Sequence, residues 1–201
     1  MVWTDIDAID EPDFNRWYDR EHMQERIALP GFRSARRYHA LHGCPLPYLA
    51  LYDTENLAVF DSDAYRNALK TQTEWSRRNF ARMLNIQRRV GERAVAGCLG
   101  EGGMLALFVV DGSGPKSSSL RHDLDAAVER EQIVCASILQ TEPRLSASLT
   151  GNAAPNVADA VVMVEATHAE AAIAAAEALA LRAGVERDEV YAFRLLWRLG
   201  A

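Results

Sequence analysis

Cysteine is scarce in this chain of 201 residues. It holds only Cys44, Cys98 and Cys135, and none of them has the C-x-x-C spacing of a redox or zinc motif. An odd number of cysteines gives no disulfide framework. We therefore expect reduced thiols, no zinc site and a cytoplasmic location.

Long apolar runs are also missing. The longest, residues 104–110, is far shorter than the roughly 20 residues that cross a bilayer as a helix. The first residues are acidic and lack the basic-then-apolar pattern of a secretory signal, so we expect no membrane association.

Positive charge is not in excess, since the formal net charge is −6. This balance disfavours non-specific binding to nucleic acids or anionic membranes. Six arginines nevertheless cluster between residues 77 and 93. No glycine-rich or stacking feature accompanies them, so we interpret them as a solvated face and expect no nucleic-acid partner.

Motifs for cofactors and for covalent catalysis are absent. The sequence contains no P-loop, no G-x-G-x-x-G and no G-x-S-x-G, so we expect no nucleotide or acyl-transfer chemistry and no cofactor. His22, His39 and His42 could in principle bind a metal. No ligand spacing demands it, and we expect no metal site.

The sequence does contain one order of predicted secondary-structure elements that occurs twice. Hydrophobic periodicity predicts strand, helix, two strands, helices and strand in residues 1–100, and a similar order in residues 101–201. The predicted strands are residues 2–7, 32–41, 48–54, 90–99, 104–111, 133–139, 160–166 and 190–199. The predicted helices begin at Asp10, Asp61 or Ser62, Thr73, Ser118 or Ser119, and Ala169, and they end near residues 29, 70, 87, 131 and 183.

This order predicts the α+β class. Each half reads as a ferredoxin-like βαββαβ unit, an antiparallel four-stranded sheet with helices on one face. Placing the two bare faces together would give an intrachain α+β barrel of two face-to-face sheets. Twelve of the sixteen aromatic residues lie in residues 1–100. We therefore predict a first unit (1–100) that carries the pocket and a degenerate second unit (101–201) that completes the barrel.

The helix after residue 10 has ionisable groups on its apolar side. At about 100° per residue, Glu21 and Glu25 fall on the face of Phe14 and Trp17, and His22 falls at its edge. A buried carboxylate needs a partner.

Two arginines on the following strand are candidate partners for these carboxylates. Arg36 and Arg37 are neighbours, and alternation sends them to opposite faces. Only one of them can lie under the helix, and the pattern does not choose between them.

Four segments carry a family resemblance. They are residues 15–22 (NRWYDREH), 29–32 (LPGF), 35–38 (ARRY) and 48–52 (YLALY), with Thr73, Trp75 and Arg78 in a T-x-W-x-x-R pattern. Together they resemble the EthD-like branch of the dimeric α+β barrel superfamily, here as a tandem fused repeat. The resemblance covers about residues 1–95. It implies kinship with cofactor-free monooxygenases, cyclases, isomerases and decarboxylases of aromatic polyketides or small rings. Many relatives have proline where this chain has Gln24.

The residues of the first half favour acid–base chemistry on a small apolar or aromatic oxygenated metabolite. His22 would be the general acid or base, and Glu21 or Asp19 would fix its tautomer. The groups expected to bind the substrate are Trp17, Tyr18, Arg36, Arg37, Tyr38, Tyr48, Tyr52 and Trp75.

Three alternatives use the same residues. The protein could bind a small molecule as a non-catalytic or accessory member of the EthD-like family. The two halves could build only an assembly interface. Alternatively, Glu21 and an arginine could simply staple the helix to the sheet. Met23 and Ile27, on the predicted outer side of the helix, suggest a homodimer of the fused barrel.

Overall fold

The computed structural model describes residues 1–111, 115–146 and 158–200. Its first elements are β1 (Val2–Ile6), α1 (Glu11–Trp17), a π-helix (Tyr18–His22), α2 (Met23–Ile27), β2 (Phe32–Ala40), β3 (Tyr48–Thr54), a 3-10 helix (Leu57–Asp61), α3 (Asp63–Lys70), α4 (Glu74–Arg82), β4 (Met83–Arg88) and β5 (Gly91–Ala96). They are followed by β6 (Met104–Asp111), α5 (Pro115–Val128), β7 (Ile133–Thr141), β8 (Asp159–Ala166), α6 (Ala169–Ala183), a 3-10 turn (Arg187–Glu189) and β9 (Tyr191–Gly200).

The strands form one antiparallel sheet in the order β4-β1-β3-β2-β9-β6-β8-β7-β5. We predicted two separate sheets, and this is wrong, because β2 hydrogen-bonds to β9 with Arg36 opposite Arg198. The α+β class is confirmed. Two strands that each looked like the end of a half-sheet pair with one another, and no local pattern reports such a long-range pairing.

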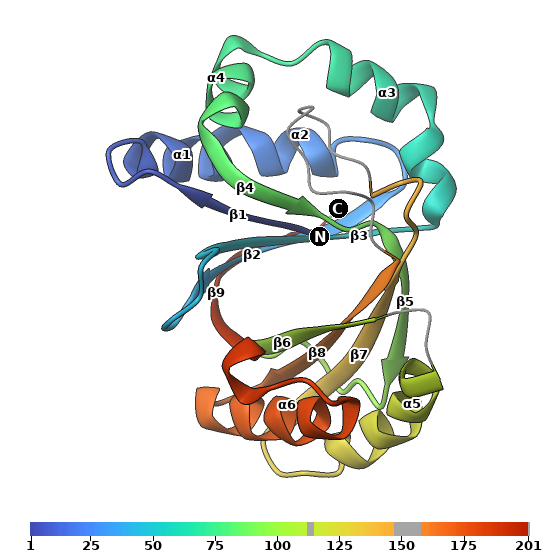
Figure 1. The fold of residues 1–201 in the computed structure, drawn as a ribbon. Coiled ribbons are helices and arrows are strands. Elements are labelled where there is room, and N and C mark those ends of the chain that lie inside the picture. The colour runs from blue at the N-terminus through green and yellow to red at the C-terminus, as the bar shows by residue number, and fades with distance from the viewer. Residues whose placement is uncertain (112–114, 147–157, 201) are drawn as a thin grey trace.

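The sheet bends at β2 and β9, so that strands of the first half face strands of the second (Figure 1). Helices α1 to α4 lie on one outer side, and α5 and α6 lie on the opposite side. Side chains from both halves meet between them in a buried cluster that includes Trp3, Leu49, Leu105, Met163 and Phe193. Among the described residues, no helix combines the length and apolarity needed to cross a membrane.

The helix predicted over residues 73–87 is too long. It ends at Arg82, and Met83 begins β4, which pairs with β1 through Met83 opposite Ile6. This segment has the arginine-rich composition of a helix, but the free edge of β1 offers a ladder of hydrogen bonds, and tertiary pairing overrides local propensity.

The strand predicted over residues 90–99 is shorter and has an unexpected partner. β5 pairs with β7, so a strand of the first hundred residues joins the second half. It begins at Gly91, where a Cβ would collide with the carbonyl oxygen of Gln140. Glycine at this position therefore permits the close approach of the two backbones.

The predicted caps agree with the structure in two of three places. Ser62 and Thr73 accept hydrogen bonds from the backbone of Tyr65 and Ser76 and so begin α3 and α4. Asp10 occupies the N-cap position of α1 but makes no side-chain cap hydrogen bond. No capping box between Asp10 and Asp13 is therefore formed.

The prediction of reduced cysteines is wrong for two of the three. Cys98 and Cys135 form a disulfide, while Cys44 is free. The bond follows from the pairing of β5 with β7, which places Ala96 opposite Ala136 and brings the two thiols together. The cysteine argument for a reducing compartment therefore no longer holds.

Candidate functional site

A π-turn decides which side chains the first helix buries. The amide of Met23 donates to the carbonyl of Tyr18, five residues earlier, so one extra residue is accommodated in this turn. The buried face then continues through His22, Met23 and Arg26. Regular α-helical spacing placed Glu21 and Glu25 on that face, and this expectation is wrong by one residue. Such turns are frequent at functional sites.

The Glu21 side chain points toward α4 and lies outside the aromatic core. Its carboxylate accepts hydrogen bonds from Thr73 Oγ1 at 2.6 Å and Ser76 Oγ at 3.1 Å. Glu25 is half-buried, and burial together with the charge of Glu21 raises its pKa. Neither carboxylate pairs with an arginine of β2 within the described residues, so the predicted ion pair of Glu21 is not formed.

His22 lies in a box of aromatic rings. Its imidazole centroid is 4.3 Å from that of Trp17, 5.1 Å from Tyr18 and 5.4 Å from Phe80. The residue is 5% exposed, and Nδ1 has no hydrogen-bond partner. Burial lowers the pKa of His22 well below 6.5, and the charges of Arg26 and Arg37 lower it further. The ring is therefore neutral at pH 7, with one nitrogen uncommitted.

A small cavity of about 60 Å³ adjoins this histidine. Besides His22, its wall includes Arg26, Tyr52 and Phe80, together with other aromatic and apolar side chains. The volume suits a functional group or a few waters, because even an engineered cavity that binds benzene measures about 150 Å³. A larger molecule could therefore place only one end here.

Tyr52 lines the same cavity from β3. Its ring centroid is 6.4 Å from that of His22. Its hydroxyl lies near that of Tyr18 but makes no hydrogen bond of good geometry. Burial raises the pKa of Tyr52 well above 10, so the hydroxyl keeps its proton at neutral pH.

Arg37 is the arginine that lies under the helix. Its guanidinium is 4.4 Å from the Tyr18 ring centroid and also lies over the Phe14 and Tyr48 rings. It donates to Asp19 Oδ1 at 3.1 Å and Asn15 Oδ1 at 2.5 Å. Arg37 therefore fastens the helix to the sheet through its buried guanidinium. The structural alternative expected an arginine in this role with Glu21 as its partner, but the carboxylate that pairs with it is that of Asp19.

The remaining predicted residues divide between the two faces of the sheet. On the helix side, Trp17 donates to Ser76, Trp75 donates to Asp13, and Tyr48 donates to Glu11. Tyr38 lies on the interior face, where burial is the main cause that raises its pKa and its hydroxyl has no partner. Met23, expected on the outer side, is fully buried within the chain. It therefore gives no support to a dimer contact.

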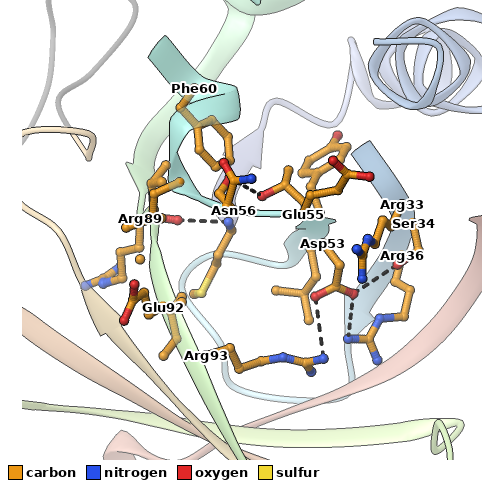
Figure 2. Close-up of a pocket in the computed structure, with 18 of the residues that line it drawn as sticks. Arg33, Ser34, Arg36, Asp53, Glu55, Asn56, Phe60, Arg89, Glu92 and Arg93 are labelled. Atoms are coloured by element: carbon orange, nitrogen blue, oxygen red, sulfur yellow. Dashed lines mark hydrogen bonds and ion pairs between the residues drawn. The ribbon is translucent and has the colours of Figure 1, made fainter. Parts of the chain in front are cut away.

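Arg36 faces the interior, where a cavity of about 710 Å³ opens between the two halves (Figure 2). Its polar lining includes Arg33, Ser34, Arg36, Asp53, Glu55, Asn56, Arg89, Glu92, Arg93 and Arg198. Its apolar lining includes Met1, Leu51, Leu57, Phe60, Val90, Val95, Leu139 and Met163. A large concave cavity is the usual place of a small-molecule site, and this one is lined about equally by polar and apolar side chains.

Two arginines in the wall of this interior cavity are joined to two carboxylates, of which Asp53 lines the cavity and Glu165 does not. Arg36 Nη1 donates to both oxygens of Glu165 at 2.9 Å and lies 3.6 Å from Asp53 through Nη2. Arg93 approaches Asp53 at 3.5 Å and Glu165 at 3.8 Å. Glu165 also accepts the amide of Gly102. The cluster connects β2, β3 and β5 with β8 of the second half.

The sequence prediction missed this cluster. Arg93 was interpreted as part of a solvated face, and that holds for Arg77 and Arg78 but is wrong for Arg89 and Arg93. Arg89 forms a partly buried ion pair with Asp159, and Arg93 lines the interior cavity. The alternation of Gly91, Arg93 and Val95 along a strand is the one signal that could have placed Arg93 on an inner face.

The interior cavity and the small cavity adjoin one another. Met1, Tyr52, Phe60 and Val90 line both. A molecule bound in the interior cavity therefore lies one side chain away from the His22 box.

The buried neutral His22 predicts a dependence of stability on pH. An unfolded histidine takes up a proton near pH 6.5, whereas folded His22 does so only at much lower pH. The unfolded state thus binds more protons as the pH falls below about 6.5, and the free energy of unfolding falls by up to about 1.4 kcal/mol per pH unit. His22→Phe should remove this component, as urea denaturation at several pH values would measure. His42→Gln, at an exposed position, is the control, and parallel curves for wild type and His22→Phe would contradict the expectation.

The likeness of this chain to known proteins lies in its fold. No family model and no curated protein sequence matches the chain. An anthrone oxidase-like protein superposes with a TM-score of 0.65 at 10% identity, over 100% of this chain and 91% of its own. A proposed monooxygenase from Lactobacillus acidophilus NCFM gives 0.60 at 8% identity, over 99% and 93%. Another, from Fusobacterium nucleatum subsp. nucleatum ATCC 25586, gives 0.54 at 10% identity, over 99% and 91%.

The chain shares the fold of these proteins. At 8% and 10% identity the likeness concerns the fold alone, and their names describe those proteins.

Proposed function

We propose that the protein is a cofactor-free enzyme that moves a proton on a small apolar or aromatic oxygenated metabolite, with His22 as the base. One observation carries the proposal. A neutral, buried histidine with an uncommitted Nδ1 and a tyrosine hydroxyl without a good hydrogen bond line one small cavity. Pairs of titratable groups whose environments push their pKa values apart are typical of acid–base sites.

The chemistry follows from these two groups. His22 Nδ1 would accept a proton from a C–H or O–H bond of the substrate, whose electron pair stays behind as an enolate or phenolate. The Tyr52 hydroxyl would donate a hydrogen bond to that oxygen. Because burial disfavours the imidazolium, and the charges of Arg26 and Arg37 disfavour it further, the step suits a substrate with an acidic proton. Return of the proton to another atom completes an isomerisation. In a cyclisation the enolate carbon would first bond to a carbonyl carbon of the same molecule, and the resulting alkoxide would take up the proton.

Oxygenation is the variant that the structural neighbours favour. Two similarly folded proteins are named as monooxygenases, and a third as anthrone oxidase-like. The enolate carbon formed at His22 would add dissolved dioxygen to give a hydroperoxide. Loss of water from the hydroperoxide, with cleavage of its O–O and C–H bonds, would leave one oxygen atom in a new carbonyl group and release the other as water. The first proton-transfer step is the same in each variant.

Glu21 would act as a positioning residue. It accepts from Ser76, whose hydroxyl accepts the indole N–H of Trp17 at 3.0 Å, and Trp17 stacks on His22. Glu21 thus influences the orientation of the imidazole through two intermediates, and it makes no hydrogen bond to the ring itself among the described residues.

The rival function is binding without turnover. The interior cavity of about 710 Å³ favours it, because this cavity has room for a whole metabolite and no histidine is found in the described part of its lining. Ligand binding that does not depend on His22 and leads to no reaction would support this function.

A substrate panel tests the proposal. Anthrone and other enolisable aromatic ketones would be offered in D₂O, with deuterium uptake followed by NMR and oxygen consumption by electrode. We expect His22→Gln to lower turnover by about 10²- to 10⁴-fold, the usual contribution of a general base. His42→Gln, at an exposed position, should leave turnover unchanged. Turnover by folded His22→Gln at the wild-type rate would sink the proposal.

The two halves would be tandem copies of one unit. Strands β4-β1-β3-β2 of the first half correspond in chain order to β9-β6-β8-β7 of the second. We propose that they form two ferredoxin-like units, divided near residue 100, and that together they build one α+β barrel around the interior cavity.

A further inference from the structure

Arginine dominates the polar wall of the interior cavity. Of the residues that the structure describes, five arginines line it against three carboxylates, and no lysine or histidine does. Guanidinium groups are planar forks of N–H donors, a geometry that matches carboxylates. Figure 2 shows that Arg33 and Arg36 on β2 and Arg93 on β5 project around Asp53 from different sides.

Arg36 is largely committed to the protein. It is 2% exposed and makes its short hydrogen bonds to Glu165. Its Nε alone has no partner. The two carboxylates hold Arg36 in place and neutralise it, so it serves as the fixed part of the wall.

Arg93 is the side chain with unused donors. It lies 3.5 Å and 3.8 Å from Asp53 and Glu165, and among the described residues it makes no hydrogen bond. Its side chain is 28% exposed. A guanidinium that is held by charge but forms no hydrogen bond can turn its N–H groups to an incoming acceptor at little cost.

Arg33 adds a second uncommitted cation. It is exposed where it lines the cavity, and among the described residues it forms no ion pair. The cavity also offers an apolar surface from Leu51, Leu139 and Met163. A ligand with an apolar body and one anionic end would match both features.

We propose that the interior cavity binds an aromatic or aliphatic carboxylate, with the carboxylate on Arg93 and the apolar body against the leucine and methionine wall. Arg33, which forms no ion pair among the described residues, adds a second set of N–H donors for it. This proposal extends the proposed function by naming the class of its substrate. Only the identification of the carboxylate as the substrate rests on that function; its binding does not. Binding is measured without turnover, so the carboxylate site can fail while proton transfer at His22 stands.

The test compares two ligands of one shape and different charge. Isothermal titration calorimetry would use 2-naphthoate and its neutral methyl ester as probes. We expect the carboxylate to bind more tightly than the ester. Arg93→Gln should weaken 2-naphthoate by about tenfold to a hundredfold, as expected for charge-assisted hydrogen bonds, and leave the ester unchanged. Arg77→Gln, on the exposed face of α4, is the matched control.

Two further variants keep the outcome decisive. Val95→Trp adds bulk at an exposed position of the cavity lining and should weaken both probes. If Arg93→Gln fails to fold, Arg33→Gln should still reduce the preference for the carboxylate. Equal binding of the two probes, or full binding of 2-naphthoate by folded Arg93→Gln, would overturn the proposal. Binding that Val95→Trp leaves intact would place the ligand elsewhere and overturn it as well.

Discussion

Replacing Glu165 by alanine is expected to lower the free energy of unfolding by about 3–5 kcal/mol. Glu165 is 3% exposed and holds Arg36 through two hydrogen bonds of 2.9 Å. Removing the carboxylate leaves the Arg36 guanidinium buried with only a 3.6 Å contact to Asp53, and it also leaves the Gly102 amide unpaired. Urea denaturation followed by circular dichroism would measure the change.

Two controls separate the cost of an uncompensated charge from the loss of an ion pair in general. Arg144→Ala removes the exposed pair with Asp61 and should change stability little, because solvent screens such pairs. The double variant Glu165→Met with Arg36→Met should recover much of the loss, since an apolar pair can replace a buried ionic one. A Glu165→Ala protein as stable as wild type would show that the buried cluster does not connect the halves energetically.

The strands and helices that carry strong hydrophobic periodicity were predicted well. β3, β6 and α6 lie where the sequence placed them, because their apolar residues repeat with a clear period. The disagreements lie where partners come from far along the chain. β4 follows α4 because this segment can form a ladder of hydrogen bonds with the edge of β1, and β5 pairs with β7 across the predicted boundary near residue 100. Local sequence carries no record of such partners.

The site was predicted in composition more closely than in geometry. The sequence indicated an aromatic helix with His22 and an arginine strand, and alternation correctly sent Arg36 and Arg37 to opposite faces. The π-turn could not be foreseen, because regular spacing of about 100° per residue is the only rule that a helical wheel applies. One extra residue in that turn exchanges Glu21 for His22 in the core.

Arg37→Met is expected to lower the free energy of unfolding by about 2–4 kcal/mol. The buried guanidinium contacts the rings of Phe14, Tyr18 and Tyr48 and donates to Asn15 and Asp19. Desolvated cation–π contacts contribute roughly 2 kcal/mol, and hydrogen bonds from a charged donor about 1.5–3 kcal/mol. Methionine keeps part of the packing, so the loss stays below the sum. Chemical denaturation would measure it.

The same substitution has a second expected effect that packing alone would not produce. The charge of Arg37 lowers the pKa of His22, so its removal should raise that pKa toward 6.5. An NMR titration of the His22 ring would follow the shift, and the loss of stability below pH 6.5 should become smaller, because the folded state then takes up its proton closer to the unfolded value. Arg78→Met, which breaks a half-exposed pair with Asp13, should leave the His22 pKa unchanged. If both variants left it unchanged, Arg37 would be a staple alone. A shift for Arg37→Met only would show that the residue that fastens the helix also keeps His22 neutral.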